Sequence, residues 1–261
     1  MTFTLFSAAG LLALVLLLAG VSLRSKRHDA GIPATVTSRV LRVRNFLSDV
    51  YAARVGSRVI VFDAGMDPDA RALERLLASL GADLDAVSDI FLTHGHFDHV
   101  AAAARCPHAK VHIGAADAEV LAHRIASRAL VPRLFGTLLG TPAVEASHRL
   151  EGSARVDVGQ GESVLAVPMP GHTPGSYAYL FDGVLFTGDA LWIDDAGITL
   201  TEAADVALTQ AICRSITQLN ELFQQHRVSA ICTGHRGCTP LQGATPLLEV
   251  LVPAAAESCA D

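Results

Sequence analysis

The stretch LTHGHFDHV, from Leu92 to Val100, places three histidines and one aspartate within six residues. It follows the apolar segment SDIF, which is typical of a short buried strand. Neutral imidazole and carboxylate groups are ligands that suit zinc, and also iron or manganese. The stretch therefore indicates the first part of a metal site, whose other ligands must come from elsewhere in the chain.

Three later segments have the same form, in which a strand-like run ends and a metal-binding side chain follows. They are PGHTPGS, FTGDA and CTGH. A lone histidine in such a place is more often structural, but loops at strand ends are where a rigid scaffold can aim several side chains at one point. The candidate metal ligands are His94, His96, Asp98, His99, His172, Asp189 and His235. Seven ligands exceed the need of one tetrahedral ion and suit two ions, each with an open position for water.

The order of the segments predicts an α+β fold. Strand-like runs before residue 66 are followed by a helix over residues 67–81, with Asp67 or Asp69 as its N-cap and Gly81 at its end. A second helix is expected over residues 115–130. The second half repeats the plan, with a hairpin that turns at Asp182-Gly183 and a helix over residues 201–227. Two such halves predict an αββα sandwich of two mixed β-sheets flanked by helices.

Residues 131–151 show no clean period, although they include several leucines. Such a segment can form a lid or the wall of a pocket, and packing in the core is an equal alternative.

The N-terminus predicts a membrane anchor. Residues 2–23 carry no charged side chain, and this length is about what a helix needs to cross a bilayer. We therefore expect a transmembrane helix over residues 1–23, a tether over 24–37 and a metal-binding domain over 38–261. The basic cluster of Arg24, Lys26 and Arg27 follows the span, which favours a single-pass protein with a cytoplasmic domain. A small-x-small site at Gly20-Val21-Ser22 leaves a cleaved signal peptide open.

The composition of the chain disfavours some classes of binding partner and cellular compartment. The chain has 261 residues, of which 51% are hydrophobic, and a net charge of −6, which disfavours nucleic acid as a partner. It does not fix the oligomeric state. The cysteines are Cys106, Cys213, Cys232, Cys238 and Cys259. Because their number is odd and no CxxC pair occurs, we expect free or buried thiols, which fit a reducing compartment.

The ordered motifs THGHFDH, GHTPGS, TGDA and TGH resemble those of the metallo-β-lactamase superfamily, over about residues 38–240. The resemblance implies that His94, His96 and His172 hold a first metal ion. It implies that Asp98, His99 and His235 hold a second, and that Asp189 bridges the two. Asp63 in VFDAG matches an early aspartate of the superfamily whose role is mainly structural.

The sequence differs from several branches of the superfamily at individual motif positions, and these differences reduce the number of branches that it resembles. The commonest zinc β-lactamases have a cysteine in place of Asp189, which disfavours antibiotic hydrolysis. Glyoxalase II-like enzymes usually have a histidine in place of Gly95 and a basic C-terminal region, and flavodiiron members have an acidic residue inside the first motif. The chain lacks these features. The broad group of lactonase-like and other ester-cleaving hydrolases remains.

The resulting expectation is a metal-dependent hydrolase with two divalent ions, zinc favoured over Mn²⁺ or Fe²⁺. A hydroxide bridging the ions would attack an ester, lactone or thioester-like carbonyl of a small-molecule substrate. Asp98 would also be catalytic by passing a proton to the leaving group. Tyr177, Tyr179 and Arg236 lie near ligands in the sequence, where substrate contact competes with strand packing or a surface position.

Three alternatives stay open. The first is a mononuclear iron dioxygenase of the persulfide dioxygenase type, and the second is a phosphodiesterase or nuclease of the same superfamily. The third is a non-catalytic scaffold tethered to the membrane.

Overall fold

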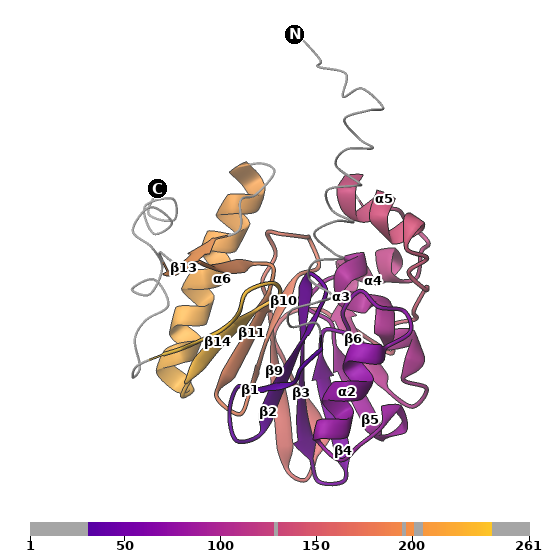
Figure 1. Cartoon of the computed structure of the whole chain (residues 1–261). Coiled ribbons are helices and arrows are strands. Elements are labelled where there is room, and N and C mark those ends of the chain that lie inside the picture. The colour runs from indigo at the N-terminus through magenta and orange to yellow at the C-terminus, as the bar shows by residue number, and fades with distance from the viewer. Residues whose placement is uncertain (1–30, 128–129, 195–196, 201–205, 242–261) are drawn as a thin grey trace.

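The fold is a sandwich of two β-sheets with helices on both outer sides (Figure 1). The computed structural model describes residues 31–127, 130–194, 197–200 and 206–241. The first sheet has the order β1-β2-β3-β4-β5-β6-β7, formed by Ala34–Thr35, Val40–Asn45, Ser48–Val55, Arg58–Phe62, Val87–Phe91, Lys110–Gly114 and His148–Leu150. The second has the order β15-β14-β11-β10-β9-β8, formed by Gly237–Pro240, Ala230–Thr233, Val184–Gly188, Tyr177–Phe181, Glu162–Pro168 and Ala154–Gly159.

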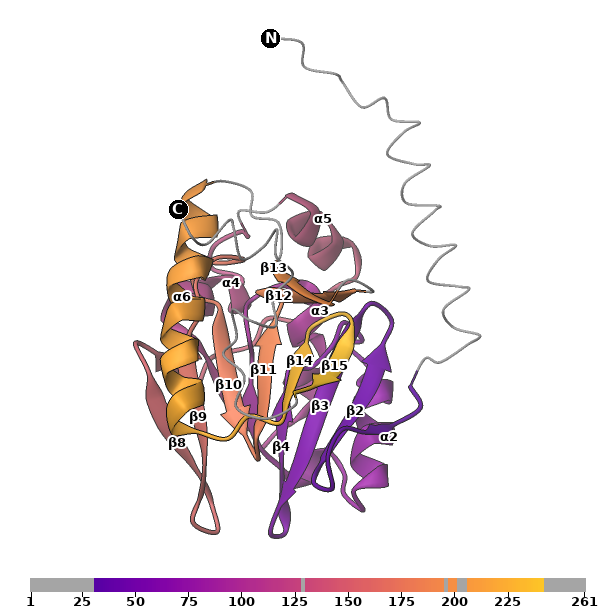
Figure 2. The same cartoon turned by 90° about the vertical axis from the view of Figure 1, so that its left-hand side faces the viewer.

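The remaining elements flank the sheets or lie at one end of them. A separate two-stranded sheet consists of β12 (Leu191–Asp194) and β13 (Gly197–Leu200). The helices are α2 (Arg71–Ser79), α3 (Phe97–Val100), α4 (Ala115–Leu121), α5 (Leu130–Leu138) and α6 (Val206–Gln225), with 3-10 turns over Leu84–Ala86 and Ala101–Arg105. Figure 2 shows α3, α5, β12 and β13 at the same end of the sandwich.

Both sheets are mixed, as predicted. In the first sheet β4, β5, β6 and β7 run parallel, whereas β1 to β4 pair antiparallel. In the second sheet β11 and β14 are parallel, and the other pairs are antiparallel. The expected αββα sandwich is therefore confirmed.

The strand sequences explain why both faces of each sheet are covered. Successive side chains of a strand point to opposite faces. In β4, Val59 and Val61 pack in a cluster with α2, whereas Ile60 and Phe62 pack between the sheets. Phe62 stacks there on Phe186 of the second sheet, with ring centroids 3.9 Å apart. After the exposed Arg58, every residue of β4 is apolar, and such a strand needs this two-sided burial.

Helix α2 has its N-cap three residues after Asp67 and one residue after Asp69, the two predicted caps. Its N-cap is Ala70, so the expected N-cap at Asp67 or Asp69 is wrong. Asp67 still contributes, because its Oδ2 accepts the backbone N–H of Arg71 at 3.1 Å. The helix ends at Ser79 with Leu80 as its C-cap, and the expected stop, Gly81, follows with a φ of +65°, a conformation that glycine adopts without a steric cost.

Two other local predictions have different outcomes. The hairpin turn at Asp182-Gly183 is confirmed, because both residues have positive φ, 51° and 74°. The helix predicted over residues 115–130 is too long. Helix α4 ends at Leu121, and His123 then adopts a φ of 57°, which reverses the chain.

The expected membrane anchor over residues 1–23 and the first part of the tether lie outside the described residues. Among the described helices, none combines the length and the apolar character that a membrane span requires.

Candidate metal centre

All seven predicted ligands lie at one end of the sandwich, where strands of both sheets end. His94, His96, Asp98 and His99 follow β5, and His172, Asp189 and His235 follow β9, β11 and β14. Strands β9, β11 and β14 run in one direction, because β9 and β11 are both antiparallel to β10 and β14 is parallel to β11. Their carboxyl ends therefore meet at one edge, where they face the end of β5.

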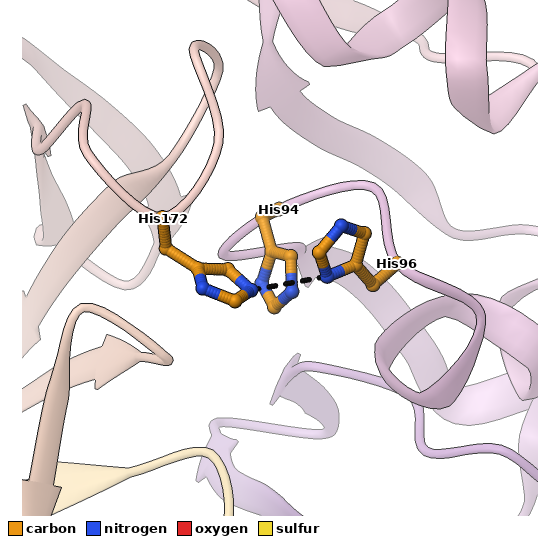
Figure 3. A group of neighbouring side chains, drawn as sticks. All are labelled: His94, His96 and His172. Carbon is orange, nitrogen blue, oxygen red and sulfur yellow. Dashed lines mark hydrogen bonds between the residues drawn. The ribbon is translucent and has the colours of Figure 1, made fainter. Parts of the chain in front are cut away.

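The first ligand group consists of His94, His96 and His172, whose ligand atoms lie within 4.8 Å of one another. The three rings converge on one point (Figure 3), with Nε2 of His172 3.0 Å from Nδ1 of His96. Burial lowers the pKa of all three imidazoles, that of His96 to about 3. Uncharged imidazoles keep the lone pairs that a metal ion requires.

The second group consists of Asp98, His99 and His235. Oδ2 of Asp98 lies 3.5 Å from Nε2 of His235 and 3.6 Å from Nε2 of His99. Burial alone would lower the pKa of both imidazoles. The nearby carboxylates outweigh it and raise both values, that of His99 strongly. This group attracts positive charge, and metal binding here would release protons.

Asp189 lies between the two groups. Its carboxylate oxygens lie 3.0 Å from Nε2 of His235 and 3.4 Å from Nε2 of His99, both in the second group. The same carboxylate is 3.5 Å from Nε2 of His172 and 3.9 Å from Nε2 of His94, both in the first. Burial disfavours its charge, but the surrounding imidazoles hold its pKa well below the usual value. An ionised carboxylate in this position can reach ions in both groups.

The donor set fits divalent metal ions. Nε2 of His94 and Nε2 of His99 are buried and have no hydrogen-bond partner among the described residues. Such atoms are costly to bury unless something else binds them. The backbone also approaches closely at Gly234, where an added Cβ would lie 2.2 Å from Oδ1 of Asp189 and 2.6 Å from Cε1 of His99. The absence of a side chain at Gly234 thus leaves room for the side chains of Asp189 and His99.

Asp63 holds the first motif from behind. Its Oδ1 accepts the N–H of Thr93 at 2.8 Å, and its Oδ2 accepts the hydroxyl of Thr93 at 2.9 Å. The same Oδ2 lies 2.9 Å from Nδ1 of His99. A carboxylate at this nitrogen fixes the tautomer and leaves Nε2 of His99 free to face the site. The supporting role that the resemblance implied for Asp63 agrees with these contacts.

Hydrogen bonds to the first sheet hold the loop that carries His235. Nδ1 of His235 is 2.9 Å from the carbonyl oxygen of Leu47, and Arg44 donates to the carbonyl of His235. Asp49, which is fully buried, accepts the N–H of Gly237 at 2.8 Å and donates its own N–H to Gly234 at 2.7 Å. The β2–β3 hairpin of the first sheet therefore positions a ligand of the second.

A disulfide joins Cys232 and Cys238, which face each other across β14 and β15. Cys213 is also disulfide-bonded, and Cys106 is a buried free thiol. The expectation of free thiols is therefore wrong for these three cysteines and correct for Cys106. The count of cysteines misled because it does not show which strands pair. The bridge closes the base of the His235 loop.

The two tyrosines near the ligands pack between the sheets. Tyr177 and Tyr179 are buried, and the hydroxyl of Tyr179 donates to the carbonyl of Leu92 at 2.8 Å. Arg236 instead lies over the ring of Trp192, with its Cζ 4.8 Å from the ring centroid. Trp192 is 5.6 Å from the ring of His235, so this pair forms one border of the site.

A cavity of about 460 Å³ lies beside the first ligand group, between α3, α4 and α5. His96 lines it together with the apolar residues Phe97, Val100, Leu121 and Ile125. Part of residues 131–151 forms another wall, including Gly136 and Thr141, so the interpretation of this segment as a pocket wall is confirmed. Val144 of the same segment is buried in the core.

Two residues near the ligands were missed by the sequence analysis. Trp192 follows Asp189 by three positions, and an aromatic residue so close to a ligand could have been considered. Asp117, in the first turn of α4, is 3% exposed and bonds to the loops of His94 and His172. An aspartate next to a strand end was its only local signal.

Comparison with known proteins agrees with this geometry. The family description "Metallo-beta-lactamase superfamily" matches residues 43–226. The chain belongs to this superfamily. A hydroxyacylglutathione hydrolase of Fuscovulum blasticum is 31% identical over 172 residues, which cover 64% of this chain and 55% of that relative. An uncharacterized protein of Bacillus subtilis is 31% identical over 153 residues, which cover 56% of this chain and 62% of that relative.

Solved structures of the superfamily share the fold. A subclass B3 metallo-beta-lactamase of Bradyrhizobium japonicum matches with a TM-score of 0.60 and 17% identity, over 90% of this chain and 92% of that one. This likeness concerns the fold alone. The curated relatives named above are matched over 55% and 62% of their own length.

Proposed function

We propose that the protein is a metal-dependent hydrolase that uses two divalent ions, zinc favoured, to cleave a thioester, ester or lactone. The observation that carries the proposal is Asp189, whose carboxylate lies within 4 Å of imidazole nitrogens in both ligand groups. A carboxylate shared by two three-residue groups suits a metal pair better than a single ion. The thioester is placed first because relatives at about 30% identity are named hydroxyacylglutathione hydrolases.

The residues divide the work as follows. His94, His96 and His172 would hold one ion, Asp98, His99 and His235 the other, and Asp189 both. When bound, the ions would supply an activated water at neutral pH and polarise the carbonyl. Asp98 is 8% exposed at the side of the second group, from where its carboxylate would take a proton from the attacking water and pass it to the leaving group.

The cavity supports a substrate with an apolar acyl group. Its wall includes His96, so a group bound there would lie next to the first ligand set. Phe97, Val100, Leu121 and Ile125 offer an apolar surface to such a group, and Arg124 and Arg133 also line the cavity. A carbonyl at the ligands and an acyl chain in the cavity would be bound together.

The experiment is metal analysis of the purified protein, followed by a substrate panel. We expect about two zinc ions per chain and hydrolysis that stops when a chelator removes them and returns with Zn²⁺. Thioesters and lactones with apolar acyl chains should be cleaved faster than acetyl analogues, phosphodiesters or β-lactams. One iron per chain with oxygen consumption would instead establish the dioxygenase alternative, and a metal-free, inactive protein would establish the scaffold.

We further propose that residues 2–23 attach the domain to a membrane. Two observations favour opposite sides of the membrane for the metal-binding domain. The basic cluster after the span favours the cytoplasm, whereas disulfide-bonded Cys213, Cys232 and Cys238 favour an oxidising compartment. We give the disulfides more weight, because the charge rule rests here on one short span with three basic residues.

The expected result is therefore activity of a periplasmic-type phosphatase reporter, and no fluorescence of a cytoplasmic reporter, when each is fused to the C-terminus of the full chain. Alkylation of the unreduced protein should modify none of the three bridged cysteines. The opposite reporter pattern would place the domain in the cytoplasm and support the charge rule.

A further inference from the structure

The carboxylate of Asp117 connects the two loops that carry the first ligand group. Its Oδ2 accepts the N–H of Gly95 at 2.8 Å, and Gly95 stands between His94 and His96. The same Oδ2 accepts the hydroxyl of Thr173 at 2.7 Å, directly after His172. Its Oδ1 accepts the N–H of Gly175 at 3.0 Å. Asp117 therefore bonds to a loop of each sheet at once.

The loops are shaped to admit this side chain. A Cβ added to Gly175 would lie 2.6 Å from Cγ and Oδ1 of Asp117, and one added to Gly95 would lie 3.3 Å from its Cβ. Gly114, at the end of β6, lies close to the backbone of the His172 loop, because its added Cβ would lie 2.2 Å from the carbonyl oxygen of Gly175. At Gly95 the approach is milder, and Asp117 would have to shift by a few tenths of an ångström to admit a Cβ there.

The Thr173 contact belongs to a closed network. Its hydroxyl lies 2.8 Å from Oγ of Ser176, and that oxygen accepts the N–H of Thr173 at 3.0 Å. Asp117, Thr173 and Ser176 are all less than one tenth exposed. A buried network in which the polar groups satisfy one another holds a loop in one conformation.

The contacts are limited to one of the two ligand groups. Within the described part of the chain, every hydrogen bond of the Asp117 carboxylate goes to the loops of His94, His96 and His172. The second group has its own supports, among them Asp63 behind His99 and Leu47 behind His235. Removing Asp117 should thus disturb one metal ion and spare the other.

We infer that Asp117 is a positioning residue that sets the affinity of the first metal site, formed by His94, His96 and His172, without touching the metal. The inference rests on the metal pair of the proposed function. Groups that orient metal ligands from outside typically change affinity by about 10- to 100-fold when lost.

The experiment compares Zn²⁺ binding by the wild-type full chain and by Asp117→Asn, in competition with a chromophoric chelator. Reference variants His172→Ala and His235→Ala identify which binding step belongs to which group. In Asp117→Asn we expect the step lost in His172→Ala to weaken by about 10- to 100-fold, and the other step to stay within about twofold. Asparagine offers one acceptor oxygen where the carboxylate has two, so the three bonds cannot all persist.

Two further variants separate this effect from general destabilisation. Asp89, in β5, is a similarly buried carboxylate, bonded to His112 at 2.9 Å, and no hydrogen bond from it to the ligand loops is found among the described residues. Asp89→Asn should lower the unfolding temperature and leave both zinc steps intact. Thr173→Val removes one of the three bonds and should weaken the first step alone, by less than Asp117→Asn.

Equal weakening of both steps in Asp117→Asn, or the same pattern in Asp89→Asn, would show a merely structural role and overturn the inference. Unchanged binding in Asp117→Asn and Thr173→Val would do so too. A wild-type chain that binds no zinc would instead contradict the proposed function, so the two failures are distinguishable.

Discussion

Replacement of Asp189 by alanine is expected to abolish hydrolysis and reduce zinc content below two ions per chain, while the fold is kept. The carboxylate lies within 4 Å of nitrogens of His94, His99, His172 and His235. Without it, both ligand groups lose their shared anion, and several imidazoles remain close together with less negative charge between them. The loss of activity should exceed the roughly 10- to 100-fold effect of removing an outer support of a ligand.

The comparison that sharpens this prediction is Asp98→Ala. Asp98 lies within 4 Å of His99 and His235, the two histidines of the second group. The Asp98→Ala variant should therefore lose one zinc ion and keep the other, whereas Asp189→Ala should weaken the binding of both ions. Zinc analysis and hydrolysis of the best substrate of the panel measure the difference, with circular dichroism as the test of folding. Activity of Asp189→Ala at the wild-type level would contradict the shared-carboxylate arrangement.

The largest loss of stability is expected for Asp63→Ala. This change leaves the N–H and hydroxyl of Thr93 and Nδ1 of His99 without their acceptor, and all of these residues are at most 2% exposed. Breaking one partner of a buried charged pair typically costs about 3–5 kcal/mol. Asp63 also has a φ of 55°, a conformation that aspartate tolerates better than alanine. Urea unfolding in the presence of a chelator measures the effect without bound metal.

Asp182→Ala is the matched control for Asp63. Asp182 has a φ of 51°, close to that of Asp63, but its carboxylate makes a partly exposed ion pair with Arg39 at 3.3 Å. We expect a loss of about 1 kcal/mol for the backbone conformation and little for the surface pair. If Asp63→Ala were no more destabilising than Asp182→Ala, the buried bonds of Asp63 would contribute nothing measurable.

The sequence predicted which side chains would gather at one end of the sandwich, because the segments that carry them follow the ends of strands. His94, His172, Asp189 and His235 come after apolar runs that needed no long-range information to recognise. Parallel strand directions then bring those ends together, which is a property of the fold class.

What the sequence could not predict depends on contacts between distant segments. Asp117 bonds to groups 22, 56 and 58 positions away, and its place just after a strand end does not by itself reveal these contacts. The Cys232–Cys238 bridge depends on the pairing of β14 with β15. The end of α4 depends on the left-handed conformation of His123, a residue that helices otherwise accept.

The ligands are divided between the two sheets, and this has a consequence for evolution and engineering. Tyr179 reaches across the sandwich to the carbonyl of Leu92, and Tyr51 reaches across to the carbonyl of Thr233 at 2.7 Å. Between them, Phe62 and Phe186 fill the gap. The thickness of the hydrophobic layer thus determines how far apart the two halves of the metal centre stand. A change of one core aromatic residue, far from any candidate ligand, can therefore adjust the distances between the side chains of the first sheet and those of the second within each ligand group.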